Sequence, residues 1–440
     1  MTPPPAGGTD GPVLPALTGD TRVTLLPLSS RPFGEDEHIV GRMETGAFVA
    51  LPPAGLRAVE LLGQGQSLDG TRARLLAEYG EDVDVADFVT GLAQYGFLAR
   101  IGHVPLPAPE PRRPSLPRLA PRHVRWSLHP VTAFLVCSLI TVAAATAVLR
   151  PDTLPTYRTL LISEYGSVVL AVVFGGGWPL LFLHELAHLV TARAAGVPAR
   201  VELGTRLQFL VAQTDMSGIE LSPRRHRLTA YLAGIAVNLC LAALAVLAQP
   251  FTAPASAGRQ FLDVLVLLAV LPLGFQCLVF LRTDLYFVLQ DLTRCHDLHG
   301  DGRAHLRHHG RRLLRRKGRK SRKGGADAGP TALLPPRQRR AVRIYSVVLL
   351  VGTLLCLGGL VVITLPVELR LLADAVGRLG SGHGAADRAD ALCVLALLGG
   401  TQLLWAWTKW RHVRAARRLA SAPQLASRRS ASADSDPGSA

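Results

Sequence analysis

Long apolar blocks dominate the chain from residue 130 onward, and they constrain its fold more than any other feature. A helix needs about 20 apolar residues to cross the roughly 30 Å of hydrocarbon in a bilayer. The chain is 49% apolar and only 18% charged, and its apolar residues gather in blocks of about this length. They predict a mainly α, polytopic membrane protein. About six transmembrane helices are expected, at 130–149, 167–190, 228–249, 261–283, 343–365 and 389–408.

The positive charges between these blocks predict an orientation. Arginines precede the first block and follow the second, whereas the short connections at 150–166, 250–260 and 366–388 carry few Lys or Arg. Because cytoplasmic loops hold the excess of positive charge, both termini are expected on the cytoplasmic side of the cell membrane. The densest basic run, 303–323, is expected to touch anionic lipid headgroups. No aromatic residues interleave with this run, so no nucleic-acid partner is expected.

The region before the first apolar block has the pattern of a small soluble domain. A Pro- and Gly-rich start, 1–20, is expected to be disordered, and a Pro/Arg-rich linker, 104–128, is expected to form a stiff spacer. Between them, 21–103 predicts an α+β, winged-helix-like cytosolic domain. Its expected elements are strands at Arg22–Leu26 and Ala47–Leu51 and helices at Pro53–Leu62, Leu68–Tyr79 and Val85–Leu98, the last capped by Asp84. The expected later parts are a membrane core at 129–300, a basic cytoplasmic loop at 301–342, two further spans in 343–408 and a tail at 409–440 that is basic and then disordered.

The second apolar block contains the pattern H-E-x-x-H, made by His184, Glu185 and His188. Positions i and i+4 lie on one face of a helix, so both imidazoles can bind one Zn²⁺ ion. Glu185 follows the first histidine and can act as general base toward a water on the metal. An ordinary amphipathic helix can also contain this pattern. Here, however, each ionisable group would cost on the order of several kcal/mol if it faced lipid, which favours a functional interpretation.

A catalytic zinc ion needs a third protein ligand and one open position. Asp284, at the cytoplasmic end of the fourth expected span, is the predicted third ligand. The predicted topology places Asp284 at a depth similar to that of His184 and His188. Asp291, seven residues later on the same helical face, is the alternative ligand or a partner that orients a ligand.

These residues resemble the site-2 protease family of intramembrane zinc metallopeptidases, especially its bacterial peptide zinc metalloprotease branch. That branch combines H-E-x-x-H with a later segment, N-P-x-x-R-x-D-G-Y-Y-x-x-x-D. The matching residues in this chain are Arg282, Asp284, Tyr286 and Asp291. The positions of the family's Asn, Pro and Gly are occupied by Leu278, Val279 and Leu285. In the family, those three residues loosen the helix around the ligand.

The resemblance extends over about 166–300 and includes the family's A-G-P-x-x-N stretch. Ala233, Gly234 and Asn238 match it, and the proline is missing. The resemblance implies that Asn238 lies near the site and holds substrate backbone. The alternative is a structural hydrogen bond between helices.

The N-terminal region is similar to the peptide chaperone of pyrroloquinoline-quinone biosynthesis and to related leader-peptide recognition domains. The similar features are the strand Ala47–Leu51, the helix that follows it and the segment 92–98. Such domains bind an extended peptide by adding a strand to a sheet edge. The alternative is a winged-helix-like domain with another partner.

Together, the residues and the resemblance predict an intramembrane zinc metalloendopeptidase that cuts a membrane-associated or leader-bearing peptide. The connection Arg200–Met216, with apolar residues at alternate positions, is expected to offer strand edges to an unwound substrate. The alternative function is a non-catalytic membrane module of peptide maturation or export with a structural metal. A structural zinc ion usually has four protein ligands, so a fourth ligand would favour that alternative. The oligomeric state is left open.

Overall fold

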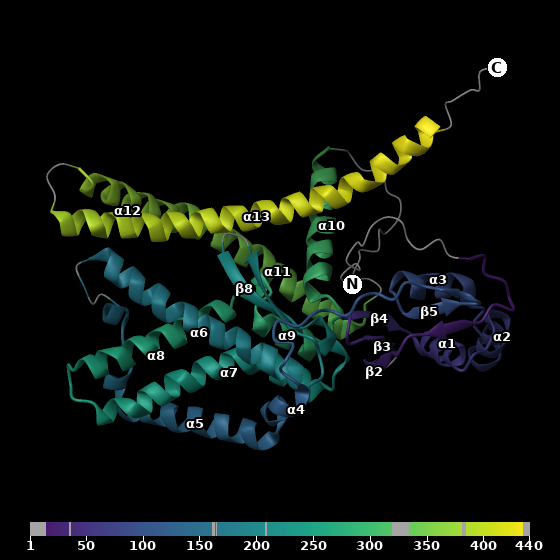
Figure 1. Ribbon diagram of the computed structural model, residues 1–440, viewed down its shortest axis with the longest axis horizontal. Coiled ribbons are helices and arrows are strands. Elements are labelled where there is room, and N and C mark those ends of the chain that lie inside the picture. Colours follow the sequence, from purple (N-terminus) through teal and green to yellow (C-terminus); the bar gives the residue numbers. More distant parts are fainter. Residues whose placement is uncertain are drawn as a thin grey trace.

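The protein is mainly helical and combines a small N-terminal domain with a larger set of long helices. The structure is a computed structural model that describes residues 15–34, 37–160, 163, 165–206, 209–318, 334–380 and 384–433. The N-terminal domain (purple) lies at one end of the long helices, and two C-terminal helices run along one side of them (Figure 1).

The N-terminal domain packs two small antiparallel sheets against three helices. Its sheets have the orders β1-β5-β6 and β2-β3-β4. Its strands are β1 (Val23–Leu25), β2 (Ser29–Phe33), β3 (Glu37–Arg42), β4 (Ala47–Leu51), β5 (Leu98–Ile101) and β6 (Val104–Pro105). Its helices are α1 (Pro53–Gly63), α2 (Leu68–Tyr79) and α3 (Val85–Gln94). Leu62, Leu75, Val89 and Phe97 are fully buried in one shared core. This core exists because each helix places its apolar face toward the sheets.

The expected elements of this domain are present, and the largest difference is at the end of the third helix. The Asp84 carboxylate caps α3 by accepting from the backbone N–H of Asp87 at 3.0 Å. The helix stops at Gln94, short of the predicted Leu98, because Gly96 adopts a left-handed conformation (φ 69°) and turns the chain into β5. Residues 1–14 of the segment expected to be disordered lie outside the described residues. Leu17, which belongs to the same segment, packs against the domain core.

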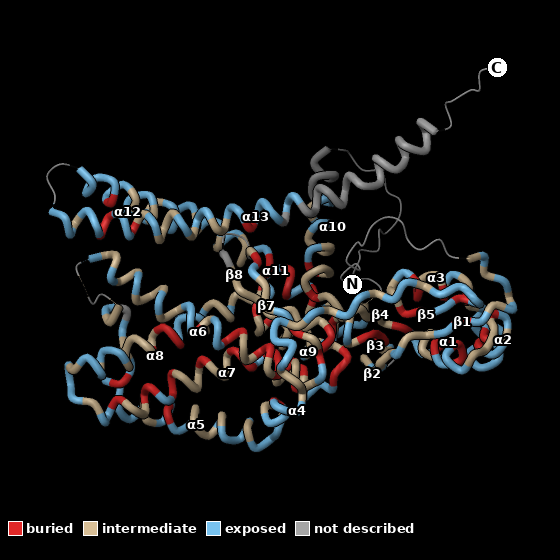
Figure 2. Tube along the Cα trace, viewed as in Figure 1, coloured by how far each residue is buried: buried red, intermediate tan, exposed pale blue. Residues whose placement is uncertain are grey.

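Within the described part of the chain, six helices are long and apolar enough to cross a membrane. They are α5 (Pro130–Leu149), α6 (Gly166–Ala194), α7 (Arg224–Ala248), α8 (Ala257–Gln276), α11 (Pro336–Gly359) and α13 (Ala385–Ala433). α7 is the central one: half of its apolar stretch is buried, against 6% for α5 and for α6. It packs against α5, α6 and α8. Figure 2 shows buried residues along α7 and mostly exposed ones on α13.

Three helical segments depart from the prediction. The fourth span ends at Gln276, not at 283, and the chain passes through η6 (Val279–Leu281) before α9 (Asp284–Thr293) begins. α11 continues through η7 (Leu360–Thr364) into α12 (Leu365–Arg378), where a loop was expected. α13 extends into the tail predicted to lack structure, because that tail is rich in the strong helix formers Ala, Arg and Leu. Its last residues, 434–440, lie outside the described part.

The basic segment predicted as a loop at 301–342 is partly helical. α10 (Leu298–Gly318) occupies its first half, and 319–333 lie outside the described residues. The remaining short elements are α4 (Pro121–Val124), η1 (Arg125–Leu128), η2 (Pro151–Thr153), η3 (Tyr157–Leu160), η4 (Ser217–Leu221) and η5 (Gln249–Phe251).

A β-hairpin and the proline-rich linker connect the two parts of the molecule. The hairpin consists of β7 (Arg200–Arg206) and β8 (Phe209–Asp215), and β8 contacts α6. The linker is fastened to the hairpin, because Arg112 forms an ion pair with Asp215 and the Ser115 hydroxyl accepts from the Val201 N–H at 2.9 Å. η4, which follows the hairpin, packs against the sheet β2-β3-β4. The N-terminal domain therefore docks directly beside the hairpin.

Candidate metal centre

Three side chains from two distant segments converge at the end of α6. His184 and His188, one turn apart on α6, are 4% and 2% exposed, and Asp284 is the first residue of α9. The Asp284 Oδ2 atom lies 2.9 Å from His184 Nε2 and 3.2 Å from His188 Nε2. The two Nε2 atoms are 3.2 Å apart. The three atoms therefore form a nearly equilateral triangle.

The size and chemistry of this triangle fit a zinc ion. Zinc bound at about 2.0–2.1 Å in tetrahedral geometry holds its ligand atoms roughly 3.3 Å from one another. Two imidazoles and a carboxylate are also a common ligand set for catalytic zinc. Among the described residues, these three side chains form the one cluster of at least three His, Cys, Asp or Glu residues that could hold a metal ion. These three donors would leave one position of a tetrahedral zinc ion for water or substrate.

The helix beside the site, α7, orients His188 and leaves room for His184. The Ala230 carbonyl, which can only accept, lies 2.7 Å from His188 Nδ1. Nδ1 therefore carries the proton, and the Nε2 lone pair is free for a metal. One turn further along α7, a Cβ atom on Gly234 would lie 2.3 Å from His184 Nε2. Only glycine leaves room there for the ligand atom.

The break after α8 positions Asp284. The side-chain Oε1 atom of Gln276 accepts from the Asp284 backbone N–H at 3.0 Å, and the Thr283 hydroxyl donates to the Gln276 carbonyl at 2.6 Å. The Gln276 amide nitrogen then faces the site, 3.5 Å from His184 Nε2. A carboxyl group binds zinc in its ionised form, so Asp284 would contribute an anionic donor.

Glu185 lies beside the donor triangle and is held by the hairpin. Its carboxylate, in a residue 6% exposed, accepts from the Thr214 hydroxyl of β8 at 2.7 Å. The same hydroxyl lies 3.1 Å from the Glu185 backbone carbonyl. One hydroxyl cannot donate fully to both oxygens, but it keeps the carboxylate next to β8. The general-base candidate thus sits between the histidines and a strand.

The other two predicted residues lie outside the triangle. Asn238 is buried one turn beyond Gly234 on α7, and its Oδ1 atom has no hydrogen-bond partner among the described residues. Asp291 pairs with Arg224 at 2.9 Å and with Arg227. The structure brings Asp284, not Asp291, to the histidines.

Gln276 and Thr214 contact the site but were not predicted from the sequence. Gln276 carried one signal, since it is an amide inside an otherwise apolar block. Thr214 carried none, because its role depends on how the hairpin folds back onto α6.

A polar contact ties the N-terminal domain to the helices that carry the site. Arg31 of β2 pairs with Glu220 of η4 at 3.1 Å, and the Tyr231 hydroxyl of α7 donates to Glu220 at 2.8 Å. The Tyr231 ring stacks on Phe287 of α9 with centroids 5.7 Å apart. α7 and α9 provide Gly234 and Asp284, so this contact joins the domain to the walls of the site.

Comparison with known proteins yields no match to any family model, curated protein or solved structure. The likeness to site-2 proteases therefore rests on the residues quoted above.

Proposed function

We propose that this chain is an intramembrane zinc metalloendopeptidase of the cell membrane, similar to site-2 proteases, with both termini in the cytoplasm. Insertion into a bilayer is supported by the exposed apolar side chains on the long helices. Phe134 on α5, Phe182 on α6 and Leu355 on α11 are 69%, 62% and 71% exposed. Apolar surface of this extent suits hydrocarbon and not water.

The convergence of His184, His188 and Asp284 beside Glu185 carries the proposal. Zinc bound to these three side chains would supply a Lewis acid that polarises the scissile carbonyl and lowers the pKa of water. The carboxylate of Glu185 takes the proton of the attacking water and delivers it to the leaving amine. Thr214 keeps that carboxylate in place, and the Ala230 carbonyl holds the His188 ring.

The substrate is a membrane-associated or leader-bearing peptide in an extended conformation. A helical substrate must unwind first, because an intact helix occupies its own carbonyls. Among the described strands, β8 is paired with β7 alone, and Thr214 of β8 also holds Glu185. A substrate strand along the free side of β8 would therefore pass the general base. The N-terminal domain, a winged-helix-like peptide-recognition domain in this proposal, docks beside the hairpin and would recruit the leader.

The test is the substitution Glu185→Gln, which removes the base and keeps the shape of the side chain. We expect cleavage of quenched-fluorescent single-span peptides in proteoliposomes to fall at least ~100-fold, because general-base catalysis contributes about that much. Zinc content by elemental analysis should remain one ion per chain. The matched control, Glu60→Gln on the surface of α1, should cleave like the wild type. Retained cleavage in Glu185→Gln would refute the mechanism.

The alternative, a non-catalytic module of peptide maturation or export with a structural metal, predicts a different result. Such a metal needs a fourth protein ligand, and the described residues contribute three to this group. Chelation would then lower the unfolding temperature of a wild type that never cleaves any of the peptides.

A further inference from the structure

α10 crosses the direction of α6, α7 and α8 (Figure 1) and is fixed by one packed face. Leu298 is fully buried, and Leu306 packs into the same cluster with Tyr345 of α11. Gly302 lies so close to α11 that a Cβ atom there would be 3.0 Å from the Tyr345 ring. These contacts determine which side of α10 faces away from the protein.

The outward side of α10 carries a row of exposed arginines. Arg303, Arg307 and Arg311 follow one another at four-residue intervals, and all three are exposed. Within the described part of the chain, none of them forms an ion pair with a carboxylate. In the N-terminal domain, by contrast, Arg57 pairs with Glu78 and Arg72 with Asp82. Like charges at this spacing repel one another and disfavour a helix, so the row is best stabilised by external anions.

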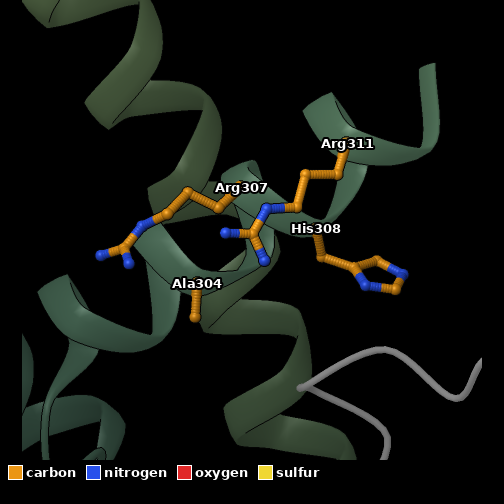
Figure 3. A pocket seen from close by; sticks show the side chains of 4 residues that line it. All are labelled: Ala304, Arg307, His308 and Arg311. Carbon is orange, nitrogen blue, oxygen red and sulfur yellow. The ribbon is translucent and has the colours of Figure 1, made fainter. Parts of the chain in front are cut away.

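Two of these arginines line a hollow on the helix surface. The hollow, of about 270 Å³, is lined by Ala304, Arg307, His308 and Arg311. Figure 3 shows the guanidinium groups of Arg307 and Arg311 on opposite sides of the small Ala304 side chain, with the His308 ring beyond Arg311. A guanidinium is a planar fork of N–H donors that matches the oxygens of a phosphate group. The hollow therefore has the donors for a phosphate monoanion.

We propose that α10 lies on the cytoplasmic surface of the membrane and binds the phosphates of anionic phospholipids through Arg307 and Arg311. The helix follows α9, whose first residue Asp284 lies at the level of the site, and it packs against α11, a candidate span. A helix that runs across the spans at their ends lies at the depth of the headgroups. The sequence of α10 has no Phe, Tyr or Trp, so it lacks the stacking side chains typical of nucleic-acid binding.

The test uses the purified full-length chain in a non-ionic detergent, titrated with phosphatidylglycerol or phosphatidylcholine. Native mass spectrometry counts the lipid molecules bound to each chain. Each Lys or Arg near an anionic surface contributes about fivefold in affinity. We therefore expect the double substitution R307Q/R311Q to weaken phosphatidylglycerol binding roughly 25-fold and to leave phosphatidylcholine binding unchanged. The effect should shrink as the salt concentration rises.

The matched control is R74Q/R100Q, which removes the same charge from exposed arginines of the N-terminal domain. It should bind phosphatidylglycerol like the wild type. Equal lipid affinity in R307Q/R311Q and the wild type would overturn the proposal. So would competition by a short single-stranded RNA or by inorganic phosphate at the lipid's own concentration, since the site would then recognise nucleic acid or free phosphate.

Discussion

The N-terminal domain and the helical region arrange apolar and ionisable side chains in opposite ways. In the domain, Leu62 and Leu75 are buried, and charged pairs such as Arg72 with Asp82 lie on the surface. In the helical region, large apolar side chains face outward, whereas His184 and His188 are buried. This contrast is the one expected if the N-terminal domain faces water and the long helices face lipid, as proposed. Under that proposal, the buried ionisable groups of the helical region are the ones expected to serve function.

The largest expected effect separates the two aspartates of α9. Asp284→Asn removes an anionic donor from the triangle, and zinc affinity should fall by more than the roughly 100-fold that loss of an orienting group costs. Asp291→Asn instead disrupts the pairs with Arg224 and Arg227, so it should keep its zinc and lower stability. The zinc content of both variants, measured after dialysis against increasing concentrations of a chelator, tests this difference. Equal zinc loss in the two variants would contradict the assignment of Asp284, and not Asp291, as the ligand.

A second expectation compares a buried leucine of the N-terminal domain with an exposed leucine of the helical region. Leu62→Ala opens a cavity in the N-terminal core and should cost about 2–5 kcal/mol. Leu355→Ala removes a side chain that is 71% exposed on α11, so it leaves no cavity and should cost less than about 0.5 kcal/mol. Hydrogen exchange of the full-length chain in detergent measures the loss of stability in both variants. A large loss of protection in Leu355→Ala would mean that α11 packs against a partner that covers this leucine.

The smallest expected effect concerns the close approach of α7 to the site. Gly234→Ala places a methyl group against His184 Nε2 and should cost about 1–3 kcal/mol of stability, typical of overpacking, together with zinc affinity. The control is Gly175→Ala on α6, because nothing lies within 4 Å of a Cβ there. Calorimetric unfolding with and without zinc measures the stability of each variant and its stabilisation by zinc. If Gly234→Ala binds zinc normally, the ligand atom must have another position.

Several features were predictable because they depend on local pattern. α2 spans Leu68–Tyr79 and α5 spans Pro130–Leu149 as predicted, because apolar periodicity and apolar length are properties of short segments. The predicted membrane depth of Asp284 also matched that of His184 and His188. Strands β2 and β3 were not predicted, since their alternation is weak and their pairing is a tertiary matter.

The sequence by itself determined the long apolar helices, the small α+β domain before them and the identity of the candidate donors. The tertiary structure decided what surrounds those donors. It ended α8 at Gln276 and led the chain through η6 and a left-handed Arg282 (φ 59°) to Asp284, although the Asn, Pro and Gly of the site-2 protease pattern are replaced here. It also brought the Thr214 hydroxyl within hydrogen-bond distance of the Glu185 carboxylate. These contacts join residues far apart in the chain, and no local pattern encodes a distance between them.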